Sequence, residues 1–186
     1  MIIGIDCDGV LYPFTEKFTK FAELKLNRDL PIPTKWEMWQ DWNISVEQWY
    51  EIYFDFLEIG GLNLAEPYVN CQEVLTRLKQ SGHTIFIITH RLLDCLNSRQ
   101  RKLVVKATID FLEDNNIPYD DLLIMQKKHL VKTNVLLDDA IHNLNSFEYG
   151  CSVCFNQPWN QEYSGYRVND WLEFETFIKG LIHEKI

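Results

Sequence analysis

Near its N-terminus the chain carries Ile2-Ile3-Gly4-Ile5-Asp6-Cys7-Asp8-Gly9-Val10-Leu11, an apolar run that ends in two acids and a glycine. This order predicts a buried β-strand that leads into a loop. Asp6 and Asp8 would share one face of an extended strand, whereas a bend at Gly9 would aim both carboxylates at one point beyond it. Carboxylates that close repel each other, and Mg²⁺ bound by oxygen ligands is the usual remedy. The alternative is a strand end with two solvated acids.

The overall composition fits one ordered globular domain with room for an insertion. The 186 residues are 46% hydrophobic and include only 6 Pro and 8 Gly. The net charge of −9 argues against binding to duplex nucleic acid, which requires many lysines and arginines, but a small phosphorylated substrate needs only a local positive pocket. Because no signal-like segment and no apolar run of about 18 residues is visible, we expect a cytoplasmic protein with reduced cysteines and no membrane association. A homodimer is one assembly that we expect such a chain to form.

The region after the first strand has a helical pattern. Aromatic and apolar residues recur at helical spacing over residues 14–26, directly after Pro13. A second helix is predicted from Ser45, and Gly60 with its neighbouring glycine closes the region. The predicted division is a core domain of residues 1–12 and 63–186 and a helical cap of residues 13–62.

The rest of the chain alternates between helix and strand. Strands are predicted at residues 84–88, 122–125, 135–137 and 152–155, and helices at residues 68–80, 98–114, 140–147 and 170–183. Near-continuous apolar strands separated by helices are typical of a parallel sheet that is covered on both faces. The fold class predicted for the chain is therefore α/β.

Chemically active residues follow the predicted strands. In a parallel sheet the carboxyl ends of the strands lie along one edge, where ligands bind. Acids, a hydroxyl and an ammonium group are expected to meet at this edge: Asp6, Asp8, Thr89, Lys128, Asp138 and Asp139. Each residue alone is weak evidence, but their joint placement predicts a site.

These motifs resemble the haloacid dehalogenase (HAD) superfamily of Mg²⁺-dependent phosphotransferases. The matching features are Asp6-x-Asp8-Gly9-Val10, a Thr after the second strand, and Lys128 ten residues before an Asp-Asp pair. The 5'(3')-deoxyribonucleotidase branch is the most similar, through Phe14, the segment from Trp42 to Trp49, and Phe155-Asn156-Gln157-Pro158-Trp159-Asn160. The resemblance implies a HAD-like Rossmannoid parallel sheet with helices on both faces and a small helical cap inserted after the first strand.

The resemblance also implies catalytic roles for the acids. Asp6 would be the nucleophile that forms an aspartyl-phosphate, and Asp8 would be the general acid and base. Mg²⁺ would be held by Asp6, by the backbone carbonyl of Asp8 and by one residue of the terminal pair. By analogy Asp139 is the expected direct ligand, and Asp138 is the supporting acid at the metal site.

Substrate contacts are implied by the same resemblance. Thr89 and Lys128 would bind phosphate oxygens. Phe14 and Trp42 in the cap could stack on a nucleobase, although an aromatic stripe at helical spacing can equally be the core of the cap itself. His90 and the arginine after it stand where family members often carry small or different residues. They are expected to adjust phosphate or leaving-group recognition, which leaves the exact substrate open.

Four other functions compete with that of a nucleotidase. A haloalkanoate dehalogenase would have no use for Asp8, and in a two-component receiver the acidic pair precedes the phosphoacceptor, the reverse of the order here. A phosphatase for another small phosphomonoester, such as a sugar phosphate or a nucleic-acid end, stays open. A non-catalytic nucleotide-binding protein is disfavoured because it would not need an acid/base residue. The substitution Asp8→Asn separates the two, since it should abolish turnover and preserve ligand binding.

Overall fold

A six-stranded parallel sheet forms the centre of the computed structural model, which describes residues 1–64, 66–91 and 96–183. The strands are β1 (Ile2–Ile5), β2 (Thr84–Thr89), β3 (Asp121–Ile124), β4 (Val135–Asp138), β5 (Cys151–Phe155) and β6 (Tyr166–Val168). Their spatial order is β3-β2-β1-β4-β5-β6. Central strand β1 pairs on one side with β2 and on the other with β4, so that Ile3 lies beside Ile85 and Val135. The predicted α/β class is confirmed.

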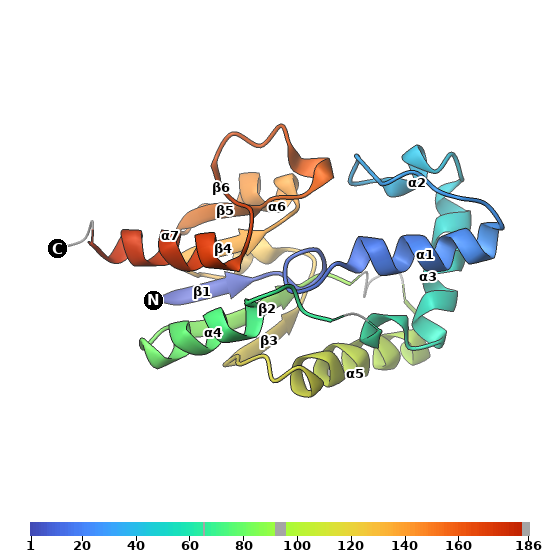
Figure 1. The fold of residues 1–186 in the computed structure, drawn as a ribbon. Helices are drawn as coiled ribbons and strands as arrows, with labels where there is room; N and C mark the ends of the chain where they lie inside the picture. Colours follow the sequence, from blue (N-terminus) through green and yellow to red (C-terminus); the bar gives the residue numbers. More distant parts are fainter. Residues whose placement is uncertain (65, 92–95, 184–186) are drawn as a thin grey trace.

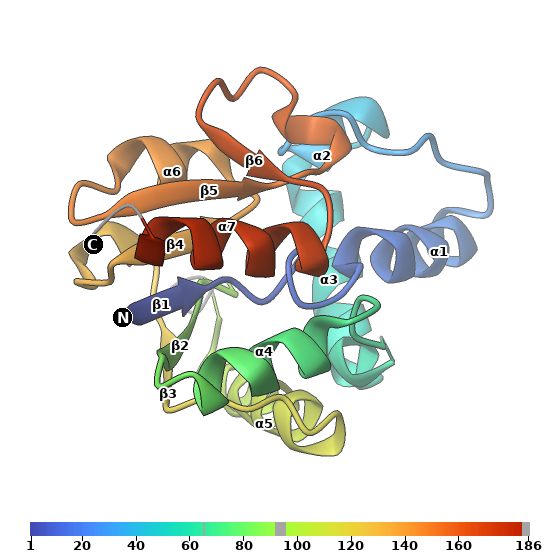
Figure 2. The same ribbon diagram turned by 60° about the vertical axis from the view of Figure 1, so that its left-hand side comes forward.

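The described residues form seven helices. They are α1 (Phe14–Leu26), α2 (Met38–Asp41), α3 (Val46–Glu58), α4 (Cys71–Gln80), α5 (Ser98–Asp114), α6 (Ile141–Ser146) and α7 (Trp171–His183), with short 3-10 turns at Gly61–Asn63, Lys128–Leu130 and Pro158–Asn160. Of these helices, α4, α5, α6 and α7 lie beside the sheet (Figures 1 and 2). One face of the sheet packs on α4, α7 and the end of α5, through Val74, Trp171 and Phe111. The other face has a smaller cluster around Leu136 and Phe147, the residue that ends α6. None of the described helices is long and apolar enough to cross a bilayer.

Three elements differ from the sequence prediction. Strand β6 was not predicted, because it has only three residues and its Tyr166 is exposed. Helix α2 is a single turn within the Trp-rich segment, which carried no helix assignment. Helix α4 begins at Cys71 rather than at residue 68, because Asn70 has a left-handed backbone (φ 65°) and the backbone N–H of Tyr68 donates to Leu11.

Helices α1, α2 and α3 pack together beyond the carboxyl ends of the strands, at the end of the molecule opposite both termini (Figure 1). Ser45 begins α3 with a capping box in which its hydroxyl accepts from the Gln48 N–H. The three helices share a hydrophobic cluster built around Phe18 and Phe56, which also includes Val104 of α5. This cluster therefore includes a residue from outside the predicted cap, and the cap limits at residues 13 and 62 stay a prediction.

Candidate active site

The loop after β1 turns sharply and is held from several directions. Gly9 has φ 78°, a conformation that L side chains rarely adopt, and the Leu11 N–H donates to the Cys7 carbonyl at 2.9 Å. A β-carbon on Gly9 would lie 2.5 Å from Oδ2 of Asp139, so a side chain there would displace the Asp139 carboxylate. The Gln157 amide donates to the Gly9 carbonyl at 2.6 Å. The turn therefore needs glycine for its backbone conformation and for its close approach to Asp139.

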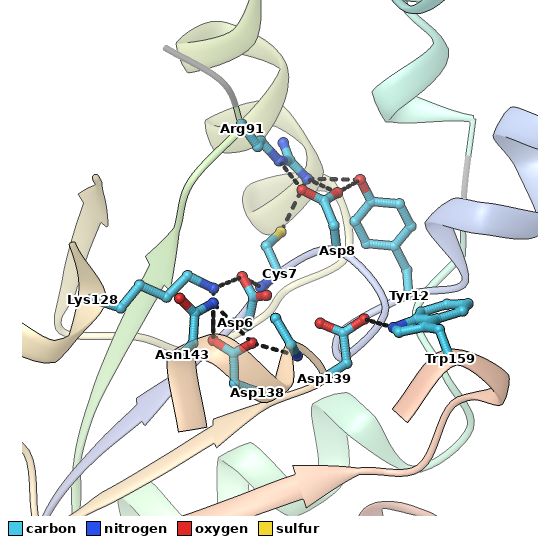
Figure 3. A network of polar contacts seen from close by, with 11 residues as sticks. Asp6, Cys7, Asp8, Tyr12, Arg91, Lys128, Asp138, Asp139, Asn143 and Trp159 are labelled. Atoms are coloured by element: carbon cyan, nitrogen blue, oxygen red, sulfur yellow. Dashed lines mark hydrogen bonds and ion pairs between the residues drawn. The ribbon is translucent and has the colours of Figure 1, made fainter. Parts of the chain in front are cut away.

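Three carboxylates meet at the carboxyl edge of the sheet (Figure 3). One oxygen from each of Asp6, Asp138 and Asp139 lies within 4.8 Å of the others, and all three residues are buried. The buried Lys128 ammonium lies 2.7 Å from Asp6 Oδ1 and 2.8 Å from Asp138 Oδ2. Three carboxylates face one ammonium, so the cluster carries an excess of negative charge when all its groups are ionised.

This excess of negative charge shifts the acid–base properties of the cluster. Burial, together with the nearby Asp138 carboxylate, raises the pKa of Asp6 to about 7 against the opposing effect of Lys128. Burial and the Asp6 carboxylate raise the pKa of Asp139 well above its usual range. Burial alone would lower the pKa of Lys128, but Asp138 and Asp6 raise it above its ordinary value. The cluster lacks positive charge, which a divalent cation would supply.

The hydrogen bonds of the terminal acid pair show which oxygens remain for an ion. Asp138 accepts from Lys128, from the Ala140 N–H at 2.9 Å and from the Asn143 amide at 3.1 and 3.2 Å. Asp139 accepts from Trp159 Nε1 at 3.1 Å through Oδ2, whereas its buried Oδ1 has no hydrogen-bond partner within the described residues. Carboxylate oxygens are the ligands that Mg²⁺ prefers, so the donor set fits this ion, with Asp139 better placed than Asp138 to hold it.

Asp8 lies apart from the cluster, in contact with an arginine. Arg91 donates from Nε to Asp8 Oδ2 at 2.9 Å and from Nη2 to Oδ1 at 3.0 Å, and the Tyr12 hydroxyl also donates to Oδ1. Figure 3 shows the Asp8 carboxylate turned toward these donors and away from Asp6. Asp6 and Asp8 line the same cavity, but the Asp8 carboxylate is held by Arg91 and Tyr12, whereas that of Asp6 belongs to the acidic cluster.

A cavity of about 340 Å³ lies between the carboxyl edge of the sheet and the cap helices. Phe14, Thr89, His90 and Lys128 line it together with Asp6, Asp8 and Asp139. The structure places Trp42 elsewhere, because its side chain is fully buried in the cap cluster and its indole donates to the Pro31 carbonyl at 3.2 Å. The aromatic wall of the cavity is instead made by Phe14, Trp36, Trp39, Trp49, Tyr50 and Tyr53.

Sequence reasoning did not assign several residues that hold the site together. Asn143 binds Asp138 from one helical turn further on, Trp159 binds Asp139, and Tyr12 binds Asp8 from four residues away. Trp159 belongs to the segment that carried part of the family resemblance, so its position was visible although its contact was not. The role of Arg91 had no local signal, since 83 residues separate it from Asp8.

The fold is that of the HAD class of hydrolases. A solved HAD-superfamily hydrolase of subfamily IA, variant 1, from Geobacter sulfurreducens superimposes with a TM-score of 0.58, covering 95% of this chain and 95% of that chain at 13% identity. Similarity at this level of identity establishes the shared fold.

Sequence comparison defines the family within this class. The profile of the family described as 5' nucleotidase, deoxy (pyrimidine), cytosolic type C protein matches residues 1–185, and the chain belongs to this family. A protein of Chlorobaculum tepidum provisionally named a 5'(3')-deoxyribonucleotidase is 24% identical over 98% of this chain and 92% of its own length. The 5'(3')-deoxyribonucleotidase of Bacillus subtilis is 34% identical over 38% of this chain and 42% of its own length. Membership in a nucleotidase family makes the chain a phosphoric monoester hydrolase.

Proposed function

We propose that this chain is a Mg²⁺-dependent 5'(3')-nucleotidase that removes phosphate from (deoxy)ribonucleoside monophosphates through an aspartyl-phosphate. The observation that carries the proposal is the buried cluster of Asp6, Asp138 and Asp139 around Lys128, at the base of a cavity with an aromatic wall. The cluster provides a nucleophile and cation ligands, and the wall provides a surface for a flat base. The family and the names of its relatives support the same reaction.

Asp6 is the nucleophile in this proposal. Its Oδ1 accepts from the Cys7 N–H at 2.7 Å and from Lys128 at 2.7 Å, and these two contacts fix the orientation of the carboxylate. A bond forms between an Asp6 oxygen and phosphorus while the bond from phosphorus to the ester oxygen breaks. Water then adds to phosphorus, which releases inorganic phosphate and regenerates the Asp6 carboxylate. Two easier steps replace one difficult hydrolysis.

Asp8 moves the protons in both steps. It lines the cavity with 25% of its side chain exposed, so a substrate oxygen can approach it. Oδ2 of Asp8, to which only Arg91 Nε donates among the described residues, carries the proton that passes to the leaving ester oxygen in the first step, and it takes a proton from the attacking water in the second. Thr89 and Lys128 bind the non-bridging phosphate oxygens, and the ammonium group also stabilises the charge of the transition state.

Asp6, Asp139 and the backbone carbonyl of Asp8 would hold the Mg²⁺ ion. When bound, the ion screens the nucleophile from the negative phosphate and stabilises charge on the phosphoryl oxygens. Asp138 supports the site by holding Lys128, since its oxygens already accept from Lys128, Ala140 and Asn143. The unpartnered Oδ1 of Asp139 is the chain's own evidence for a ligand position.

The cap contributes the base-binding surface. Phe14 contacts Phe18 and Tyr53 in the cap cluster and also lines the cavity, so one of its sides is available to a ligand. Stacking on an aromatic ring is worth about 1–3 kcal/mol per base and tolerates different bases. The cavity volume of about 340 Å³ suits a mononucleotide.

The test is phosphate release from a panel of deoxy- and ribonucleoside 5'- and 3'-monophosphates beside sugar phosphates, with Mg²⁺ and with EDTA. We expect turnover concentrated on deoxynucleotides and lost in EDTA. The matched control is Asp6→Asn, which keeps the side-chain shape but removes the nucleophile and should abolish turnover. Activity spread over sugar phosphates would contradict the substrate, equal activity in EDTA would contradict the metal, and full activity of Asp6→Asn would contradict the mechanism.

A further inference from the structure

Arg91 is a buried guanidinium that makes an unusual number of contacts beside the cavity. Its side chain has no exposed surface, and it follows Thr89 by two residues at the end of β2. Besides the two bonds to Asp8, it donates from Nη2 to the Tyr12 hydroxyl at 2.7 Å and to Cys7 Sγ at 3.0 Å, and from Nη1 to Thr108 at 2.6 Å. Removing a guanidinium from water is unfavourable unless its partners compensate, so this network must be well satisfied.

The directions of these hydrogen bonds are mutually consistent. The Thr108 hydroxyl donates to the Val104 carbonyl at 2.7 Å and therefore accepts from Arg91. The Tyr12 hydroxyl donates to Asp8 and likewise accepts from Arg91. Nη2 has two N–H groups for three acceptors, Asp8, Tyr12 and Cys7, so one of these N–H groups is shared, and Nη1 directs one of its two at Thr108. The network fixes Arg91 from α5 on one side and from the loop after β1 on the other.

The backbone of Arg91 adds a second, independent observation. Its φ is 41°, in the left-handed region that residues other than glycine rarely adopt. Such a conformation costs of the order of 1–3 kcal/mol and persists only where surrounding contacts require it. The contacts that hold the Arg91 side chain inward are those with Asp8, Tyr12 and Thr108.

Direct binding of substrate phosphate by Arg91 does not fit the geometry. Nε and Nη2 are already directed at Asp8, Tyr12 and Cys7, and Nη1 donates to Thr108. The side chain has no exposed surface from which another N–H could reach a ligand. Arg91 lines the cavity, but its side chain has no exposed surface, whereas Asp8, which accepts from it, has 25% of its side chain exposed; its influence on the reaction therefore passes through Asp8.

We infer that Arg91 is the positioning residue of Asp8, holding the carboxylate in the fixed plane from which it exchanges protons with the leaving group and with water. A bidentate guanidinium fixes both oxygens of a carboxylate, which a single donor cannot do. The inference rests on the proposed function, because it assigns Asp8 the proton-transfer role. Of the two expected roles, phosphate or leaving-group recognition, it assigns Arg91 an indirect part in the second, through Asp8.

The experiment compares two esters that differ in their need for an acid. The leaving group of a nucleoside monophosphate is a poor alkoxide that needs a proton. The leaving group of p-nitrophenyl phosphate is a stable phenolate that needs none. General acid catalysis is worth about 10²–10⁴-fold, so Arg91→Met should lower kcat/KM for the nucleotide by roughly 10²-fold and leave kcat/KM for the nitrophenyl ester within about threefold. Asp8→Asn should show the same selectivity in the first turnover, measured as the burst of nucleoside or nitrophenol, because the later hydrolysis of the aspartyl-phosphate needs Asp8 with either ester. Adding Arg91→Met to Asp8→Asn should cause no further loss.

The matched control is Arg77→Met. Arg77 forms the same bidentate pair with Glu175, at 2.9 Å for both bonds, away from the cavity, so its removal should leave both kcat/KM values unchanged. Arg91→Lys keeps the positive charge but cannot donate to both Asp8 oxygens in the bidentate geometry of a guanidinium, so it should show the same selective loss on the nucleotide. Its melting temperature verifies that the variant still folds. Equal losses on both esters, or additive losses in the double variant, would overturn the inference alone. A wild-type chain that hydrolyses neither ester would overturn the proposed function as well.

Discussion

Buried carboxylates have opposite charge surroundings on the outer face of helices α4 and α7 and at the carboxyl edge of the sheet. On the outer face, the Glu175 carboxylate accepts from Arg77 and from Lys179, and these hydrogen bonds, that from Arg77 above all, hold its pKa at about 2. At the sheet edge, burial raises the pKa of Asp6 to about 7 even though Lys128 lies 2.7 Å away. On the outer face one carboxylate has two cationic partners, whereas at the sheet edge three carboxylates share one cation.

This difference separates a part of the molecule that stabilises the fold from a part that is built for a ligand. The pair on the outer face lowers the free energy of the folded chain, because the ionised form of Glu175 is the favoured one. The cluster at the sheet edge is held in place by the surrounding fold although its own charges oppose it. Sites that bind cations or anchor catalysis commonly reduce stability in this way.

The largest expected effect is that of Lys128→Met on stability in EDTA. Removing one partner of a buried ion pair costs about 3–5 kcal/mol, because the remaining charge is left uncompensated. The loss should be greater at pH 8 than at pH 5, since the Asp6 carboxylate, whose folded pKa is about 7, takes up a proton at the lower pH. Denaturant unfolding at both pH values measures it.

The control for Lys128→Met is Lys106→Met, which removes an exposed ion pair with Asp110. Exposed pairs contribute about 0–1 kcal/mol, so this variant should lose little stability at either pH. If Lys128→Met lowered the free energy of unfolding no more than Lys106→Met, the ion pairs at the sheet edge would matter no more to stability than exposed pairs, which would contradict the comparison.

A smaller effect is expected from Trp159→Phe, which removes the indole donor to Asp139. Partners that orient metal ligands typically affect metal affinity by about 10–100-fold, so the Mg²⁺ concentration for half-maximal thermal stabilisation should rise about tenfold. Trp42→Phe loses a matched indole bond to the Pro31 carbonyl, away from the carboxylates, and should leave that concentration unchanged. An equal Mg²⁺ requirement in both variants would argue against a role of Trp159 at the site.

The smallest effect is predicted for Glu175→Gln on the outer face. Because the folded pKa of Glu175 is about 2 and its ordinary value is 4.5, its stabilisation is complete above pH 4.5 and is lost as the pH falls toward 2. Since Arg77 is 44% exposed, solvent weakens the pair, and we expect a loss of about 1 kcal/mol at pH 7 that disappears near pH 2. Urea unfolding across this range measures it, and a loss that persisted at pH 2 would contradict the assignment.

The fold could be predicted largely from hydrophobic patterning. Apolar runs marked five of the six strands, and helix α5 has the predicted bounds of residues 98–114. Strand β6 was missed because three residues with an exposed tyrosine give no periodic signal. The start of α4 was predicted at residue 68 rather than at Cys71, because hydrophobic patterning does not reveal the left-handed backbone of Asn70.

The site was less predictable where it depends on distant contacts. Motif spacing placed Asp6, Lys128 and Asp139 at one edge, because parallel strands bring their carboxyl ends together. Spacing could not show that Trp42 faces the interior of the cap, since an aromatic at helical spacing fits either side. It also could not orient Asp8, whose partner Arg91 comes from another strand end.

Helix α5 has a consequence for how the chain unfolds. Val104 in its first half belongs to the cap cluster, Phe111 in its second half belongs to the cluster on the sheet, and Thr108 between them holds Arg91. A helix that shares two hydrophobic clusters cannot lose one set of contacts without weakening the other. The cap and the sheet therefore have a structural reason to melt in a single cooperative transition rather than as two independent units.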